Sequence, residues 1–309
     1  MKNKTMVTYF LLEGISEVPE LQFLFSLLVL LMYLITLGGN LAILLLVLLD
    51  SHLHTPMYFF LFNLSTLNIS SPTVALHKLL VIFATGNNKV SFTDCIAQMY
   101  FFAWFSSNEL IVLTAMGYDR YVAICNPLHY SSVMNSTICA SLATLSWLFS
   151  FLEILPLMLP VIQFSCYTSN IINHFLCDVV TLMNITCNDT SILELVIFTQ
   201  GVFLSVFSPF LLTFISYVHI IATIMRIRSS TGRSKAFYTC SSHLTVVSLL
   251  YTTLACQYLT PNGTFKSTKL FSLLNAGVIP MLNPFIYSLK NTEVKTALQR
   301  KMKYIKSMF

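Results

Sequence analysis

Seven apolar stretches, each long enough to cross a lipid bilayer, limit what this chain can fold into. A helical crossing needs about 20 predominantly apolar residues. Only 9% of the 309 residues are charged, whereas soluble domains average about 25%. We therefore predict an all-α membrane protein, a seven-transmembrane helix bundle in a single domain, 1–309. The predicted spans are 22–49, 57–85, 92–125, 139–163, 192–226, 235–260 and 268–289.

Lys and Arg side chains predict the orientation of the bundle. Of the 17 basic residues, eleven fall on the side of the carboxyl end and six on the opposite side. Cytoplasmic loops are enriched in Lys and Arg, so we expect an extracellular tail at 1–21 and a cytoplasmic tail at 290–309. We expect no removable signal peptide, and glycosylation at the Asn3 sequon. Basic residues after Asn291 predict a short cytoplasmic amphipathic helix along membrane lipid.

An adjacent acid and base, Asp119-Arg120, stand at the end of the third apolar stretch. Ionised side chains are costly inside hydrocarbon and mark functional sites there. The pair therefore predicts a membrane boundary and a conformational switch. Residues 226–245 carry four basic side chains and no Asp or Glu, so Asp119 is the acid best placed to restrain Arg120.

Six motifs run in order through almost the whole chain. They are LHTPMYFFL (53–61), MGYDRYVAIC (116–125), NPLHY (126–130), SY (216–217), KAFYTCSSHL (235–244) and PMLNPFIYSLKN (280–291). Together they resemble the olfactory receptors, a vertebrate family of rhodopsin-like G-protein-coupled receptors. The resemblance implies a non-enzymatic odorant receptor that binds a small, mostly hydrophobic, volatile ligand in the outer half of the bundle. It also implies a stimulatory olfactory-type G protein that raises cyclic AMP, and a place in the plasma membrane of olfactory sensory neuron cilia. It implies neither a cofactor nor a nucleic-acid partner.

The resemblance maps the ligand site to the outer halves of spans three, five, six and seven. This lining is apolar and aromatic with a few hydroxyls, which suits a small hydrophobic molecule held by burial. Taken singly, each lining residue is also compatible with ordinary helix packing. The implied set is Phe102, Ala103, Ser106, Ser107, Gly201, Val202, Ser205, Tyr251, Leu254, Ala255, Tyr258 and Leu273.

Glu153 is an isolated acid inside the fourth span, because residues 127–225 contain no Lys or Arg. Two interpretations stay open. Either the carboxyl is protonated or faces an interface, or it is a polar anchor at the edge of the ligand pocket. The second interpretation favours a basic or hydrogen-bonding ligand.

The resemblance also implies a signalling switch at the cytoplasmic end. On activation span six swings outward and Arg120 meets Tyr217 and Tyr287, while Asn283-Pro284 kinks span seven. The chain departs from the family at Gly117, where Ala is usual, and at Tyr238, where Ser is usual. The implied switch residues are Asp119, Arg120, Tyr121, Tyr217, His243, Asn283, Pro284 and Tyr287.

A third departure affects an implied ion site. Asn68 stands where the family usually carries an Asp. In related receptors that acid, together with the one matched by Glu109, holds a sodium ion. Because one carboxylate is missing, we expect sodium to have a weak effect or none.

Four cysteines, Cys95, Cys166, Cys177 and Cys187, fall on the oxidising outer side. Sequence alone allows three pairings, and the resemblance implies Cys95–Cys177 and Cys166–Cys187. Residues 174–178 have an alternative interpretation as half of a metal site, as has the His52 and His54 pair. We expect no metal at either.

Two other classes of membrane protein fit the composition. A transporter or channel needs paired intramembrane charges or inverted repeats, and Glu109 and Glu153 are too few. A membrane enzyme needs a catalytic constellation, and the sequence has neither a metal-ligand motif nor a nucleotide-binding loop. Expression of such a receptor outside the nose is equally compatible with the motifs, which do not identify the odorant.

Overall fold

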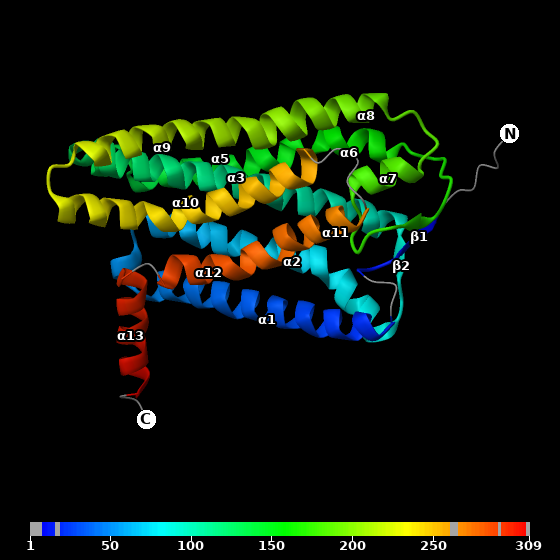
Figure 1. Cartoon of the computed structure of the whole chain (residues 1–309), viewed down its shortest axis with the longest axis horizontal. Helices are drawn as coiled ribbons and strands as arrows, with labels where there is room; N and C mark the ends of the chain where they lie inside the picture. Colours follow the sequence, from blue (N-terminus) through cyan, green and yellow to red (C-terminus); the bar gives the residue numbers. More distant parts are fainter. Residues whose placement is uncertain (1–7, 16–18, 260–264, 290–291, 307–309) are drawn as a thin grey trace.

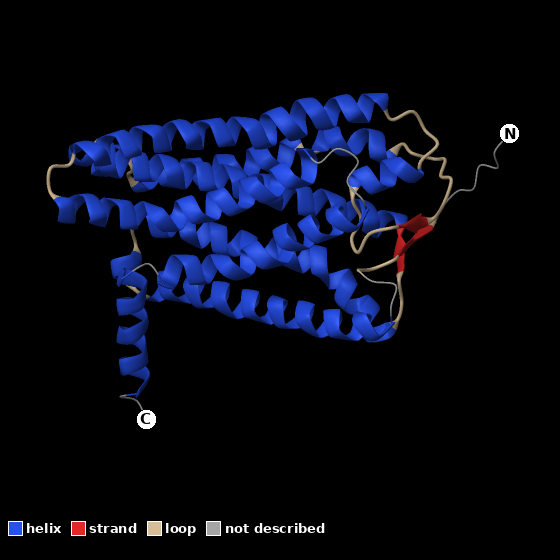
Figure 2. Cartoon of the chain, viewed as in Figure 1, coloured by secondary structure: helices blue, strands red, loops and turns tan. Residues whose placement is uncertain are grey.

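The computed structural model describes residues 8–15, 19–259, 265–289 and 292–306. Its long helices lie side by side in one bundle (Figure 1). Short strands lie at one end of the bundle, and the carboxyl-terminal helix projects from the other end at a steep angle to the long helices (Figure 2). Asn3 lies outside the described residues.

The described residues form all seven predicted helical spans. Spans one, two, three and six are single helices, whereas spans four, five and seven are each built from consecutive segments. In order, the spans are α1 (Pro19–Leu49), α2 (Pro56–Thr85), α3 (Phe92–Cys125), α5 (Ser136–Glu153) with α6 (Leu155–Ile162), α8 (Ser191–Val196) with η3 (Ile197–Phe207) and α9 (Ser208–Arg226), α10 (Ser230–Leu259), and α11 (Phe265–Leu273) with η4 (Leu274–Val278) and α12 (Ile279–Leu289). Outside the spans are η1 (Ser51–Leu53), η2 (Pro127–His129), α4 (Tyr130–Val133), α7 (Val179–Ile185) and α13 (Thr292–Lys306).

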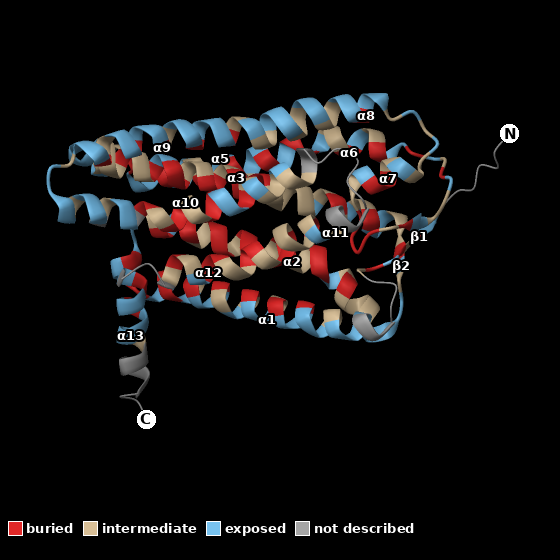
Figure 3. Cartoon of the chain, viewed as in Figure 1, coloured by how far each residue is buried: buried red, intermediate tan, exposed pale blue. Residues whose placement is uncertain are grey.

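The helices α3 and α10, although predicted as spans from the sequence, are more polar than the other spans and miss a stricter criterion of length and apolar composition. Among the described helices, five segments meet that criterion: Gln22–Leu49, Pro56–Thr85, Ser136–Ile162, Ser191–Arg226 and Lys269–Ser288. Because α3 packs against α2, α5, α9 and α10, its polar side chains are buried by protein rather than by lipid. The outward faces of α1, α5 and α9 carry exposed Leu, Ile and Phe instead, and pale blue segments of the ribbon mark exposed positions along α1 and α9 in Figure 3.

Spans one, four, six and seven begin three to five residues earlier than predicted. Span four begins at Ser136 rather than residue 139 and divides at Ile154. The division follows from Pro156 and Pro160, since proline has no N–H to donate to the preceding turn. Span six begins at Ser230 rather than residue 235, and its first turn is exposed. The apolar pattern therefore predicted the buried part of a helix better than its first residue.

The outer half of span five is a π-helix. Pro209 predicts a local deformation, and η3 extends it through the eleven preceding residues. Within it, the Ser205 hydroxyl lies 3.0 Å from the carbonyl oxygen of Gln200, five residues back. A second π segment, η4, interrupts span seven and was not predicted. Such segments are rare in proteins overall, and those that occur are often found at functional sites.

A small sheet closes the end of the bundle where the chain begins, and the all-helical prediction missed it. β1 (Tyr9–Leu12) lies between β2 (Lys89–Ser91), which is antiparallel to it, and β3 (Ile171–Ile172), which is parallel. Phe10 and Leu12 are buried, so pairing removes apolar side chains of the amino tail from water. The strands are too short for an alternating pattern to have predicted them.

Two disulfides order the second outer loop. Cys95 in the first turn of α3 bonds to Cys177, and Cys166 bonds to Cys187, which are the pairs that the resemblance implies. Asp178 caps α7 by accepting from the backbone N–H of Thr181 at 3.2 Å. Since Cys177 is bridged and Asp178 is a cap, the metal interpretation of residues 174–178 does not hold.

Candidate functional site

Glu153 lies at the end of α5 and contacts both α3 and η3. Its side chain is buried, with 7% of the residue exposed. Ser107 of α3 donates its hydroxyl to Glu153 Oε1, and the Ser205 hydroxyl of η3 lies 2.8 Å from the same oxygen. The structure thus brings this acid together with two residues of the predicted ligand lining. Neither interpretation of Glu153 from the sequence included these partners.

Several buried polar atoms on the elements of this outer site lack a hydrogen-bond partner within the described residues. They are Glu153 Oε2, Gln200 Oε1 and the Tyr251 hydroxyl. Buried polar atoms are normally paired with protein or with ordered water. The described chain therefore leaves hydrogen-bonding capacity unused at this end of the bundle.

The other predicted lining residues do not form one cluster. Phe102 and Leu273 pack on the same apolar cluster, which contains Phe175, whereas Ala103 packs on a separate cluster. Tyr251 and Leu254 belong to the main core. Ser106 and Gly201 are partly buried, Val202 and Ala255 are exposed, and the side chain of Tyr258 lies outside the described part of the structure.

The Asp119-Arg120 pair lies near the opposite end of α3. Asp119 is fully buried. Arg120 donates to its Oδ2 through Nε at 2.9 Å and also through Nη2. The Tyr130 hydroxyl donates to Oδ1 at 2.8 Å. The sequence had named Asp119 as the restraint but had missed Tyr130, whose signal was its place in the motif directly after α3.

His243 connects three helices. Its Nε2 lies 2.9 Å from the carbonyl oxygen of Leu113 in α3, so this nitrogen carries the proton and donates. The Nδ1 atom then accepts from the Tyr217 hydroxyl of α9 at 2.8 Å, and the two rings stack with an interplanar angle of 7°. The predicted switch residues Tyr217 and His243 therefore link α3, α9 and α10.

The predicted switch residues of span seven are buried. Tyr287 is 1% exposed, and its hydroxyl has no partner within the described residues. Pro284 packs against α1 so closely that a Cβ added to Gly39 would lie 3.0 Å from it. Tyr121 packs on the apolar cluster that contains Tyr217.

Asn68 belongs to a chain of amides. Its Nδ2 donates to Asn40 Oδ1 at 3.2 Å, and its Oδ1 accepts from Asn283 Nδ2 at 3.0 Å. Asn40 also donates to the carbonyl oxygen of Pro280 at 3.2 Å. Glu109 is buried, and its Oε1 has no partner within the described residues. The amide at position 68 is thus occupied by its neighbours.

A contact that the sequence did not indicate joins α13 to the turn after α1. Arg300 Nη2 lies 2.8 Å from Asp50 Oδ2, and His52 Nδ1 lies 2.9 Å from Asp50 Oδ1. Burial opposes ionisation of this carboxyl, but the hydrogen bonds from His52 and Arg300 prevail and lower the pKa of Asp50 to about 2. His54 contacts a different group, the carbonyl oxygen of Val47, at 3.0 Å. The two histidines do not form a metal pair.

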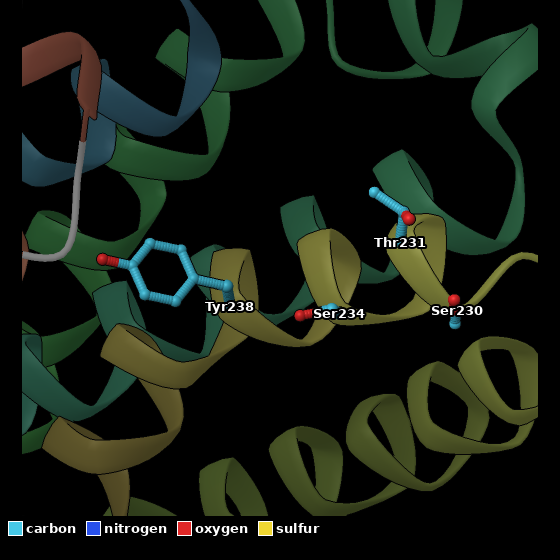
Figure 4. Close-up of a pocket in the computed structure, with 4 residues that line it drawn as sticks. All are labelled: Ser230, Thr231, Ser234 and Tyr238. Carbon is cyan, nitrogen blue, oxygen red and sulfur yellow. The ribbon is translucent and has the colours of Figure 1, made fainter.

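An open cavity of about 530 Å3 lies along the first turns of α10. Ser230, Thr231, Ser234 and Tyr238 line it (Figure 4). Tyr238 is exposed. Its ring stands at one end of the row of hydroxyls in Figure 4.

Comparisons with known proteins identify the family. The olfactory receptor family model matches residues 29–304. Olfactory receptor 6C3 of Homo sapiens is 44% identical over 299 residues, which cover 96% of each chain. Olfactory receptor 1E16 of Mus musculus is 46% identical over 303 residues, which cover 97% of this chain and 96% of that protein.

Solved structures show the same fold. The crystal structure of squid rhodopsin matches with a TM-score of 0.72 at 18% identity, covering 94% of this chain and 88% of that one. The chain therefore belongs to the olfactory receptor family and is a multi-pass membrane receptor with a rhodopsin-like fold, not an enzyme.

Proposed function

We propose that the receptor binds a small, mostly hydrophobic odorant in the outer half of the bundle and activates a stimulatory olfactory-type G protein. The observation that carries this proposal is a difference between two groups of buried polar side chains: one is fully paired within the protein and the other is not. Arg120 and His243 are held by protein partners near one end. Glu153, with Ser107 and Ser205, retains an unpaired oxygen nearer the other.

Activation follows from the contacts of Arg120 and His243. Outward movement of α10 pulls His243 away from Leu113 and frees the Tyr217 hydroxyl. Arg120 then leaves Asp119 for Tyr217 and Tyr287. The unpaired hydroxyl of Tyr287 supports this role, because it gains a charged donor only in the active state.

The G protein docks at the foot of α10. Support comes from the open cavity with Ser230, Ser234 and Tyr238 on its wall, and from the basic segment 226–235 that precedes the buried part of the helix. Movement of α10 widens this cavity toward Arg120. Tyr238, which replaces the usual Ser, adds a bulky ring to the docking surface and thereby alters the affinity for the G protein.

Sodium has little part in the proposed mechanism. Asn68 presents an N–H group to Asn40 and uses its oxygen to accept from Asn283, so a cation next to Glu109 finds one carboxylate instead of two. Replacing sodium with choline is expected to leave agonist potency unchanged. A sodium shift that disappears in Glu109→Gln would contradict this expectation.

The receptor acts in the plasma membrane, in olfactory sensory neuron cilia, with its amino tail outside and glycosylated at Asn3. The helix α13 lies along the inner leaflet. Lys295 and Arg300 are exposed on it, and such basic amphipathic helices bind anionic lipid. The bond from Arg300 to Asp50 holds the helix against the bundle.

The coupling proposal is tested with Arg120→Ala in cells that express an olfactory-type G protein. Surface amount, measured with an extracellular tag, is expected to match the unsubstituted receptor. Odorant-evoked cyclic AMP is expected to disappear. Retained cyclic AMP at normal surface amount would contradict the role of Arg120.

A further inference from the structure

The unpaired oxygen of Glu153 indicates which chemical group the ligand must carry. Glu153 Oε1 is engaged by Ser107 and Ser205, whereas Oε2 is buried without a hydrogen-bond partner within the described residues. A buried oxygen without a partner costs free energy unless a donor reaches it. Both serines belong to the lining of the proposed ligand site, so the carboxyl lies in the wall of that site.

The Oε2 atom accepts in either protonation state of Glu153. If the carboxyl is ionised, both oxygens are acceptors. If it is neutral, the Ser205 hydroxyl turns to the Gln200 carbonyl oxygen at 3.0 Å and accepts the proton of Oε1, which reverses the bond that it donates to the ionised carboxylate. On Oε2 the proton would find none within the described residues. In both states the missing group is therefore a donor.

No cation of the described chain pairs with this acid. The recorded ion pairs among the described residues join Asp50 to His52 and Arg300, and Asp119 to Arg120. Residues 127–225 contain no Lys or Arg at all. A buried carboxylate is strongly favoured by a cation that also donates hydrogen bonds.

We infer that Glu153 Oε2 is the hydrogen-bond acceptor for the ammonium group of a small aliphatic or aromatic amine, whose hydrocarbon body packs on the apolar lining. This inference rests on the proposed odorant site and adds the chemical class of the ligand. An alcohol of the same shape supplies a donor without the charge and binds more weakly. A ketone or ether supplies no donor and binds weakest.

The probes are butyl-, hexyl-, octyl-, cyclohexyl- and benzylamine, each with its matching alcohol and methyl ether. Two readouts are taken on the full-length receptor: cyclic AMP in cells, and thermal stabilisation of the purified protein, which requires no G protein. We expect at least one amine to act at about tenfold or more lower concentration than its methyl ether, as a hydrogen bond to a charged group predicts.

Three variants separate the role of the carboxyl from folding. Glu153→Gln retains the size and one acceptor but removes the charge, and it is expected to reduce amine potency by about tenfold while leaving the alcohol within about threefold. Ser205→Ala keeps the acid and is expected to retain preference for the amine. Glu194→Gln is the matched control, because Glu194 is exposed and accepts from Thr190 on the surface at 2.7 Å. Surface amount is measured for each variant.

The two readouts distinguish the inference from the coupling proposal. Stabilisation by an amine that Glu153→Gln weakens, without cyclic AMP, supports the amine site and overturns the coupling. Equal potency of amine and ether, or equal loss for amine and alcohol in Glu153→Gln, overturns the inference while odorant-evoked cyclic AMP stands. If no amine of the set binds or activates, the inference is also wrong.

Discussion

Two regions of α3, its cytoplasmic end and its middle, differ in whether the buried polar groups around them find partners within the chain. Near the end of α3 at Cys125, the Asp119 carboxylate accepts hydrogen bonds from Arg120 and Tyr130. Both ring nitrogens of His243 have hydrogen-bond partners there as well. Farther toward the start of α3, Glu153 accepts hydrogen bonds from two serines at Oε1, but its Oε2 has no partner within the described residues. The first arrangement is complete without a ligand. The second is not.

This difference separates response from recognition. Polar groups that the chain satisfies by itself lock the resting arrangement, and releasing them changes the receptor. Asn283 Oδ1, Glu109 Oε1 and the Tyr287 hydroxyl also lack a partner within the described residues, and we assign the Tyr287 hydroxyl to the active state. Polar groups left open contribute little to the fold and determine which molecule binds.

The largest expected effect of a single substitution on stability is at His243. Replacing it with Phe keeps the stacked ring but leaves the Tyr217 hydroxyl only the more distant Cys240 carbonyl oxygen, at 3.4 Å, as an acceptor, and it removes the second donor to Leu113. We expect the free energy of unfolding of the purified receptor to fall by roughly 1–3 kcal/mol. Tyr217→Phe removes the bond to His243 and the longer one to the Cys240 carbonyl oxygen, and it is expected to cost about 1 kcal/mol. An unchanged melting temperature in His243→Phe would show that the inner end is not locked by this link.

Three glycines test how tightly the helices pack at different places in the bundle. A Cβ at Gly39 would lie 3.0 Å from Pro284, whereas one at Gly38 meets nothing within 4 Å and one at Gly201 meets Ile197 of its own helix at 3.9 Å. Alanine improves helix propensity at each position by up to about 1 kcal/mol, but overpacking at Gly39 costs about 1–3 kcal/mol. We expect Gly39→Ala to unfold at a lower temperature than Gly38→Ala and Gly201→Ala. Equal melting temperatures would mean that α1 and α12 are not tightly packed.

The outer loop is expected to lose stability in acid. Burial lowers the pKa of His174 to about 4, and its Nδ1 accepts from the backbone N–H of Leu176 at 3.2 Å, so the folded state holds the neutral ring. The unfolded state binds the proton near pH 6.5. Stability is therefore complete above that pH and falls by about 1.4 kcal/mol per pH unit toward pH 4.

This dependence is measured as the melting temperature of the purified receptor between pH 7.5 and about 4.5. His174→Gln is expected to flatten the profile. His129→Gln is the control, because His129 is exposed. A profile that is equally steep in His174→Gln would assign the acid sensitivity to other groups.

The smallest expected effect is at Glu153. Because one of its oxygens has no partner, Glu153→Gln is expected to change the unfolding free energy by less than about 1 kcal/mol. Thermal unfolding of the ligand-free receptor measures this directly. A loss as large as that of His243→Phe would make Glu153 a structural residue and remove the contrast between the two regions.

Much of the helical framework could be predicted from the sequence, because apolar length and the family motifs are local signals. Apolar length predicted α3 and α10 too, although both helices are more polar than the other five spans. The π segment η3 and the pairing of β1 with two loops depend on distant contacts that no local pattern encodes. The same limit applied to Glu153: the sequence showed an isolated acid, and only the fold placed Ser107 and Ser205 on it.

The separation of recognition from response is tested most directly by measuring amine-induced thermal stabilisation and cyclic AMP in Arg120→Ala and Glu153→Gln. We predict opposite losses. Arg120→Ala keeps stabilisation by the amine and produces no cyclic AMP, whereas Glu153→Gln requires about tenfold more amine but reaches the same maximal cyclic AMP. If both variants lose both readouts to the same degree, the two regions are not distinct and the account is wrong.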